Sequence, residues 1–230
     1  MAKKAVIIYG PPGSGKGTQA NLLSWVKNFV HFDTGKYIEN SMLYNPDFKH
    51  NKVVQRERKN FERGTLFTPS WTLGVVSKAT QKIARAGFNI VYSGSPRTVY
   101  EAFGNSKNKG LVKILEKEYG KKNIFVFLLR VGPKSSTFRN VNRKVCSVCA
   151  TPVLYNEETH RHLNCPICKG RLRTRTLDKP EIMKVRLKEY ENRTKPITTE
   201  LKKRGFTIKE INGEPSPYKV FESLARALKL

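Results

Sequence analysis

A glycine-rich segment near the N-terminus places the strongest constraint on the fold of this chain. It reads Gly-Pro-Pro-Gly-Ser-Gly-Lys-Gly-Thr over residues 10–18, between an apolar run at 5–9 and a helix-compatible stretch at 19–23. Glycines let the backbone curl so that several N–H groups point at one anion, and the following helix adds its positive N-terminal end. The segment therefore predicts a strand, a phosphate-binding loop and a helix in succession.

Individual residues of this loop have distinct expected roles. Lys16 supplies a mobile positive charge for the outer phosphates of a nucleotide. The spacing from Gly10 to Lys16 fits the G-x-x-x-x-G-K pattern, but the hydroxyl follows one residue late, at Thr18, because Gly17 intervenes. The alternative is a glycine-rich turn without a ligand. The agreement of the motif with both flanking segments argues against that alternative.

Strands and helices alternate along the rest of the chain. Apolar runs at 88–92, 124–129 and 206–208 predict strands. Helices are predicted at 71–86, 111–119, 180–195 and 217–230, and a further helix begins at 138–143. This alternation predicts an α/β fold in which helices cover both faces of a parallel sheet. At 230 residues, we expect one main domain with a small insertion.

The charge of the chain is strongly unbalanced. Lys and Arg number 44 against 18 Asp and Glu, which gives a formal net charge of +26. A surplus of this size favours polyanionic partners. Two interpretations stay open: a solvated basic surface without a specific partner, or a surface that also contacts RNA, DNA or another polyanion.

Neither a membrane span nor a secretory leader is expected. Apolar runs such as 124–129 are far too short to cross a bilayer. The first predicted strand begins near residue 5, which leaves no room for a leader of about 15–30 residues. We therefore expect a cytoplasmic protein without membrane contact.

The four cysteines of the chain form two C-x-x-C pairs. They are Cys146, Cys149, Cys165 and Cys168, with fifteen residues between the pairs. This spacing is typical of a zinc ribbon, in which four thiolates close a tetrahedron around a structural Zn²⁺. Two disulfides are the alternative, and a cytosolic location argues against them. His160 and His162 lie between the pairs and are weaker candidate ligands.

Further motifs follow in a characteristic order. They are Thr34-Gly35, Gly94-x-Pro96-Arg97-Thr98, Arg139-x3-Arg143 directly before the cysteines, Arg175-x2-Asp178-Lys179-Pro180, Arg186-Leu187-x2-Tyr190 and Thr194-x-Pro196. With the loop at 10–19, they resemble the motifs of the adenylate kinase family in its zinc-lid form, over nearly the whole chain. The resemblance implies a P-loop nucleotide kinase in a single domain, 1–230. Its core would comprise 1–34, 69–141 and 179–230, with a helical monophosphate-binding insertion at 35–68 and a zinc-ribbon lid at 142–178.

The resemblance also implies an activity in nucleotide biosynthesis, the Mg²⁺-dependent transfer of the γ-phosphoryl group of ATP to AMP. Such a transfer depends on positioning and on neutralising charge. Catalytic roles are implied for Lys16, Arg97, Arg143, Arg175 and Arg186. ATP contacts are implied for Gly13, Ser14, Gly15, Lys16, Gly17, Thr18 and Arg139, and monophosphate contacts for Thr34, Gly35, Gly94, Arg97 and Glu101.

The chain departs from the family pattern mainly on the acceptor and metal side. The family usually has Asp where this chain has Lys36 and Ser93, Arg where it has Glu39, Gln where it has Glu101, and a second Asp where it has Leu177. These departures leave two alternatives open: a kinase for another nucleoside monophosphate, or a kinase-like protein that binds RNA or the ribosome with weak turnover. The resemblance further implies a monomer.

Overall fold

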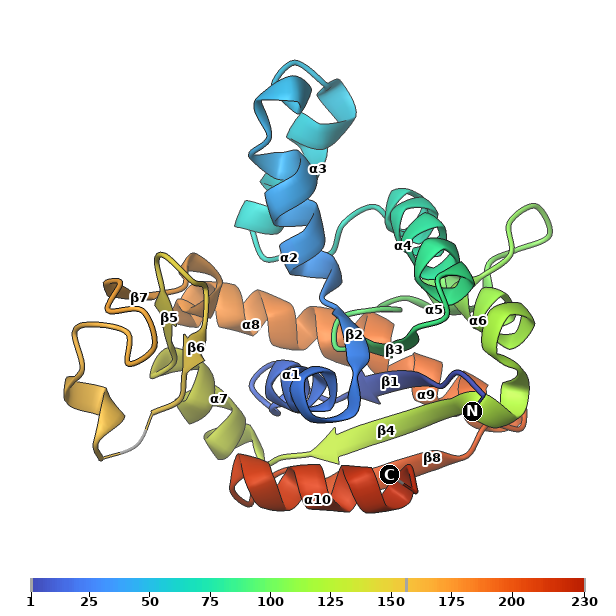
Figure 1. The fold of residues 1–230 in the computed structure, drawn as a ribbon. Coiled ribbons are helices and arrows are strands. Elements are labelled where there is room, and N and C mark those ends of the chain that lie inside the picture. Colours follow the sequence, from blue (N-terminus) through green and yellow to red (C-terminus); the bar gives the residue numbers. More distant parts are fainter. Residues whose placement is uncertain (1, 156, 230) are drawn as a thin grey trace.

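A parallel sheet forms the centre of the computed structural model, which describes residues 2–155 and 157–229 (Figure 1). Strand β1 (Ala5–Tyr9) lies in the middle, between β3 (Asn89–Tyr92) and β4 (Ile124–Arg130). Strands β2 (Phe29–Phe32) and β8 (Ile208–Asn212) form the two edges. Each residue of β1 is buried, as expected for a parallel strand with helices on both faces. The predicted α/β fold is confirmed.

The register aligns the carboxyl ends of three neighbouring strands. Ile7 pairs with Tyr92 on one side and with Val126 on the other, and Tyr92 also pairs with Phe32 at the end of β2. The segments that follow β1, β2 and β3 therefore leave the same edge of the sheet. Ligands of open α/β sheets bind at this edge.

Two apolar layers result from the alternation of side chains along β1. Its odd-numbered residues pack into the core under one group of helices, and its even-numbered residues pack under another. The first group is α4 (Pro69–Arg85), α5 (Val99–Phe103), α6 (Leu111–Tyr119) and α9 (Lys195–Lys203). The second is α1 (Lys16–Lys27) and α10 (Pro217–Ala227).

A helical segment projects from the carboxyl edge of the sheet, at the top of Figure 1. It contains α2 (Thr34–Ile38), a π-helical turn (Glu39–Leu43), a 3₁₀ turn (Pro46–Phe48) and α3 (Lys52–Glu62). Ile38, Leu43 and Val54 form a small apolar core of its own, which also packs against the start of α4.

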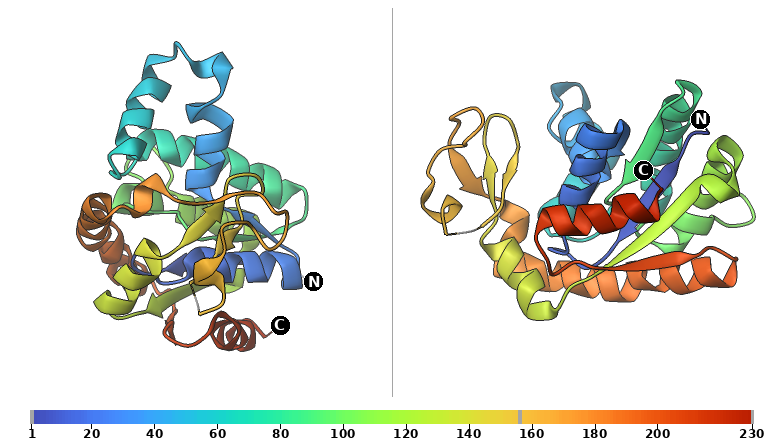
Figure 2. Two further views of the ribbon diagram at one scale, coloured as in Figure 1. Left: turned by 90° about the vertical axis from the view of Figure 1, so that its left-hand side faces the viewer. Right: turned by 60° about the horizontal axis from the view of Figure 1, so that its bottom comes forward.

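An antiparallel sheet with the order β6-β5-β7 stands apart from the central sheet, as the right-hand view of Figure 2 shows. Its strands are β5 (Lys144–Cys146), β6 (Pro152–Val153) and β7 (Leu172–Thr174). It is joined to the core through α7 (Pro133–Val141) and α8 (Pro180–Glu189). The structure thus contains both expected appendages, while their division from the core at the stated residues stays a prediction.

Several element boundaries differ from the sequence prediction, and α7 begins at Pro133, before the helix expected at 138–143. Residues 29–32 form an edge strand that was not predicted, because half-buried His31 interrupts its apolar pattern. The last strand is 208–212 and not 206–208, since Phe206 packs into the core before the strand begins. The helix expected at 180–195 ends at Glu189, and a π-helical turn then leads into α9.

None of the helices in the described part of the chain is long and apolar enough to span a membrane.

A buried carboxylate ties α3 to the segment that enters α4. The side chain of Glu57 is fully buried and accepts hydrogen bonds from the Thr68 N–H (2.8 Å), the Thr68 hydroxyl (2.6 Å), Arg56 Nε (2.9 Å) and Asn60 Nδ2 (3.2 Å). Burial alone raises the pKa of Glu57, but these hydrogen bonds outweigh it and hold the pKa below its usual value.

We predict that Glu57→Gln lowers the free energy of unfolding by roughly 1–3 kcal/mol at neutral pH, because a charged acceptor is lost. A carboxylate with a lowered pKa stabilises the fold above its unfolded-state pKa and loses this effect as the pH falls through the folded-state value. The difference between the two proteins should therefore shrink in acid. Urea denaturation at neutral and acidic pH measures it, with exposed Glu62→Gln on the same helix as the control. An equal loss at both pH values would contradict the prediction.

Candidate active site

The loop between β1 and α1 has the backbone shape of an anion cradle. Gly13 and Gly15 adopt φ values of +85° and +91°, in the left-handed region that side chains disfavour. A Cβ at Gly13 would lie 2.3 Å from Asn140 Nδ2 and from the Ser136 carbonyl oxygen on α7. The Ser136 hydroxyl also donates to the Pro12 carbonyl. Helix α7 therefore supports the loop from outside.

Two polar groups of the loop are poised for a ligand. Lys16 Nζ donates to the carbonyl oxygens of Gly10 and Pro11, both at 2.8 Å. Ser14 Oγ is buried and has no hydrogen-bond partner among the described residues. A buried hydroxyl without a partner is unfavourable, so an anion bound in the loop would satisfy it.

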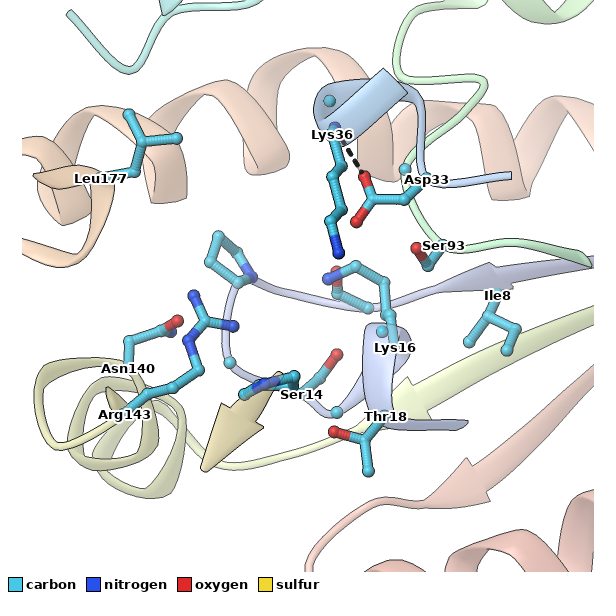
Figure 3. Close-up of a pocket in the computed structure, with 18 of the residues that line it drawn as sticks. Ile8, Ser14, Lys16, Thr18, Asp33, Lys36, Ser93, Asn140, Arg143 and Leu177 are labelled. Carbon is cyan, nitrogen blue, oxygen red and sulfur yellow. Dashed lines mark hydrogen bonds between the residues drawn. The ribbon is translucent and has the colours of Figure 1, made fainter. Parts of the chain in front are cut away.

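A cavity of about 1220 Å³ lies over this loop, between the helical segment at 34–62 and the antiparallel sheet. Figure 3 shows Lys16 with Asp33, Lys36 and Ser93 on one side and Asn140 and Arg143 on the other. The cavity wall contains all fifteen residues predicted to be catalytic or to bind nucleotide: Gly13, Ser14, Gly15, Lys16, Gly17, Thr18, Thr34, Gly35, Gly94, Arg97, Glu101, Arg139, Arg143, Arg175 and Arg186.

Positive charge converges on Lys16. Burial lowers the pKa of Lys16 well below its usual value, and the nearby guanidinium groups of Arg97, Arg186 and Arg143 lower it further. The Asp33 carboxylate opposes this effect. Cations repel one another most strongly where water is excluded, so negative phosphates are the ligands that this arrangement favours.

Asp178 holds two of these arginines. Its fully buried carboxylate accepts from Arg143 Nε at 3.0 Å and from Arg143 Nη2 at 2.8 Å and 2.7 Å, and it accepts from Arg186 Nη1 at 3.1 Å. Arg186 Nη1 also donates to the Leu177 carbonyl oxygen. Burial lowers the pKa of Arg186 to about 10, while Asp178 raises it and neighbouring arginines lower it. The Asp178 carboxylate therefore fixes the orientation of both guanidinium groups.

The turn after β3 positions Arg97. Arg97 Nε donates to the Gly94 carbonyl oxygen at 2.7 Å, and its backbone N–H donates to Glu101 Oε2 at 2.9 Å. Thr98 Oγ1 lies 3.1 Å from Glu101 Oε1 and caps α5. Burial raises the pKa of Glu101, opposed first by the hydrogen bond from the Arg97 backbone. Glu101 therefore supports the Arg97 turn as well as lining the cavity.

A histidine that the sequence analysis did not single out lies at the same sheet edge. His31 Nδ1 is 2.7 Å from Asn21 Oδ1, and His31 Nε2 is 2.7 Å from Ser93 Oγ. Burial lowers the pKa of His31, against the effect of Asp33. Because the Asn21 Oδ1 atom accepts, His31 donates through Nδ1–H, and its Nε2 accepts a hydrogen bond from the Ser93 hydroxyl. The signal that would have identified His31 is its position near the carboxyl end of β2, where it also lines the cavity.

The other departures from the family pattern also line the cavity. Lys36 is exposed, and its backbone N–H donates at 3.2 Å to Asp33 Oδ1, which caps α2. Glu39 and Leu177 are half-buried in the cavity wall.

The root of the antiparallel sheet is anchored by Arg139. Its Nη1 donates to the Gly213 carbonyl oxygen and its Nη2 to the Glu214 carbonyl oxygen, both at 2.7 Å. Glu214 Oε2 lies 3.7 Å away from the same guanidinium. Arg139 therefore links α7 to the segment before α10 at the rim of the cavity.

The four cysteines meet in the antiparallel sheet as free thiols. Their sulfur atoms all lie within 4.8 Å of one another, with Cys146 Sγ 3.4 Å from Cys168 Sγ and Cys149 Sγ 3.7 Å from Cys165 Sγ. The backbone N–H groups of Val148 and Ile167 point at Cys146 Sγ and Cys165 Sγ. This arrangement is compatible with a tetrahedral zinc site, and the disulfide alternative is not observed.

Curated proteins with similar sequences extend over most of the chain. The adenylate kinase of Borrelia recurrentis (strain A1) is 31% identical over 194 residues, which cover 84% of this chain and 81% of the relative. The adenylate kinase of Clostridium botulinum (strain Hall / ATCC 3502 / NCTC 13319 / Type A) is 30% identical over 228 residues, 97% of each chain. That of Acetivibrio thermocellus is 29% identical over 206 residues, 87% of each chain. No protein-family model matches the chain.

These three relatives each cover more than four fifths of the chain. The alignment with the Clostridium botulinum relative reaches nearly end to end in both proteins. The fold, the cavity and the cysteine cluster agree with the resemblance noted in the sequence. The chain belongs to the adenylate kinase family.

Proposed function

We propose that this protein is an adenylate kinase, which transfers the γ-phosphoryl group of ATP to AMP and releases two ADP. The observation that carries the proposal is the convergence of Lys16 and four arginines on one cavity over a phosphate loop. Curated relatives that bear the name adenylate kinase support it.

The transfer is an in-line exchange of one bond for another. An oxygen of the AMP phosphate attacks the γ-phosphorus, the bond to the β–γ bridging oxygen breaks, and ADP leaves with that oxygen. Lys16 and the loop N–H groups hold the donor phosphates, and Arg97 holds the acceptor phosphate. Arg143, Arg175 and Arg186 stabilise the charge that spreads over the transferred group.

Asp178 is a positioning residue in this scheme. By holding Arg143 and Arg186 it fixes both guanidinium groups in the cavity wall. We further propose that residues 142–178 act as a lid and residues 35–68 as the monophosphate-binding insertion. Closure of the lid would exclude water, which otherwise accepts the phosphoryl group.

The donor set beside Lys16 suits a hard cation that accompanies ATP. The Thr18 hydroxyl and the Asp33 carboxylate line the cavity, and oxygen ligands of this kind suit Mg²⁺. Mg²⁺ held there would neutralise charge on the donor phosphates. Because Lys36 and Ser93 replace acids of the family pattern, we assign the carboxylate role on this side to Asp33.

The cellular compartment and the oligomeric state of the protein are also proposals. Four free thiols gathered for a metal suit a reducing compartment, which favours the cytoplasm. A monomer stays a prediction. The alternative of a kinase-like RNA- or ribosome-binding protein with weak turnover is not favoured, because it gives no reason for several arginines to surround Lys16.

The catalytic proposal predicts that Arg143→Lys lowers kcat by roughly 100-fold or more, since a bidentate, fixed guanidinium is replaced by a mobile ammonium. A coupled assay of ADP formation from ATP, Mg²⁺ and AMP measures it. Arg171→Lys, at an exposed position directly before β7, is the matched control and should keep wild-type turnover. Near-normal turnover of Arg143→Lys would remove the residue from the site, and wild-type protein without turnover would overturn the proposed function.

We also propose that the four cysteines hold a structural Zn²⁺. Four thiolates leave no open coordination position on the metal. We infer that the segment depends on metal coordination for its fold, because its apolar core is small.

We predict that metal analysis finds about one zinc per chain and that a chelator lowers the melting temperature. Cys149→Ser should lose the zinc and melt earlier, while Ser147→Ala, a neighbour that is not a ligand, should retain both properties. Protein purified without metal, with all four thiols reactive, would exclude the zinc site.

Glu101 is the residue that we assign to reading the acceptor base. An ionised carboxylate accepts but does not donate hydrogen bonds. It therefore suits the amino group of a base, which donates, and not adenine N1, which accepts. Its raised pKa favours a protonated fraction that can donate.

Glu101→Gln is expected to raise kcat/KM for AMP relative to CMP, UMP and GMP, because the amide supplies a donor at every pH. In the wild-type protein, the preference for AMP should fall as the pH rises and Glu101 ionises, whereas the variant should show a flat profile. An equal change for all four monophosphates would show that Glu101 acts only through the Arg97 turn.

A further inference from the structure

A second cavity lies at the end of the molecule opposite the phosphate loop. Its volume is about 280 Å³, and it is bounded by the end of α5, the loop to α6, α6 itself and the turn between α9 and β8. Phe206 in its wall precedes β8 at the amino end of that strand, whereas the phosphate loop follows the carboxyl end of β1. Figure 1 shows α6 and the lid at opposite sides of the molecule.

A flat cationic platform forms one wall of this cavity. The Arg204 guanidinium lies over the Phe103 ring, 4.2 Å from its centroid, and the side chain is exposed. Lys121 Nζ lies over the Phe206 ring at 5.0 Å and donates to the Arg204 carbonyl oxygen at 2.9 Å, which fixes the turn. Guanidinium planes are surfaces on which unpaired nucleobases stack.

The rest of the cavity rim carries positive charge. Lys109 and Lys113 line it together with Arg204, against one lining carboxylate, Glu116, which lies 3.8 Å from Lys113 Nζ. The side chain of Lys113 is 72% exposed, so its ammonium is accessible. The exposed surface around the cavity adds Lys107, Lys121, Lys122 and Lys202. A stacking plane beside clustered ammonium groups matches the chemistry of one base with its phosphate.

We propose that this second cavity binds a nucleotide unit, with its base on Arg204 and its phosphate at Lys109 and Lys113. The lysines that continue beyond the cavity, and the net charge of +26, favour a unit within single-stranded nucleic acid over a free mononucleotide. The site is separate from the catalytic cavity and does not depend on the proposed kinase activity.

The test uses a fluorescent single-stranded oligoribonucleotide and full-length protein whose catalytic cavity is saturated with ATP. Fluorescence anisotropy should show binding that weakens steeply with salt. The double variant Lys113→Glu/Arg204→Glu should bind at least roughly ten-fold more weakly, the scale of losing a stacked base and a phosphate contact. The control Lys219→Glu/Arg226→Glu, on exposed positions of α10, changes the net charge equally and should lose much less. Both variants should keep wild-type kinase turnover.

A conservative variant separates stacking from charge. Arg204→Lys keeps the charge but removes the plane, so it should weaken binding of the oligonucleotide and leave binding of an abasic strand of the same length unchanged.

A free nucleotide carries the same base and phosphate as a unit of single-stranded nucleic acid. Calorimetry of ATP binding distinguishes these two ligands. If the wild-type protein binds one more equivalent of ATP than the double variant does, the second cavity is a site for free nucleotides. Equal losses in the double variant and in the α10 control, or no binding of either probe at this cavity, would overturn the proposal.

Discussion

The active site depends on electrostatic repulsion between buried cationic side chains. Burial lowers the pKa of Lys16 and of Arg186, and neighbouring guanidinium groups lower both pKa values further. The buried Asp178 carboxylate offsets part of this repulsion and orients Arg143 and Arg186. The remaining imbalance favours phosphate, because a bound polyanion supplies the missing negative charge.

The central sheet holds these cationic side chains close together despite their repulsion. Its register brings the phosphate loop, the Asp33 turn and the Arg97 turn to one edge, and two apolar layers hold the sheet rigid beneath them. The antiparallel sheet, by contrast, has little apolar core and exposes Val148, Leu163 and Ile167. Its small apolar core and its position apart from the central sheet support the proposal that it acts as a lid.

The departures from the family pattern have a local structural basis. Ser93 is paired with His31, which is itself held by Asn21, so the position is filled by a neutral hydrogen-bonded chain and not by an acid. Glu101 is tied to the Arg97 turn through both carboxylate oxygens. Both residues therefore hydrogen-bond to other residues of the protein near the phosphate loop.

The sequence by itself determined the phosphate loop, the strand–helix alternation and the paired cysteines, because each depends on residue types at short, regular spacing. It also predicted which residues would line the cavity, although only through resemblance to a family. Only the tertiary structure decided that Asp178 binds two arginines, that His31 contacts Ser93, and that Arg204 lies over Phe103. Those contacts join residues from separate elements. The spacing of residues within one element does not determine how distant elements pack against one another.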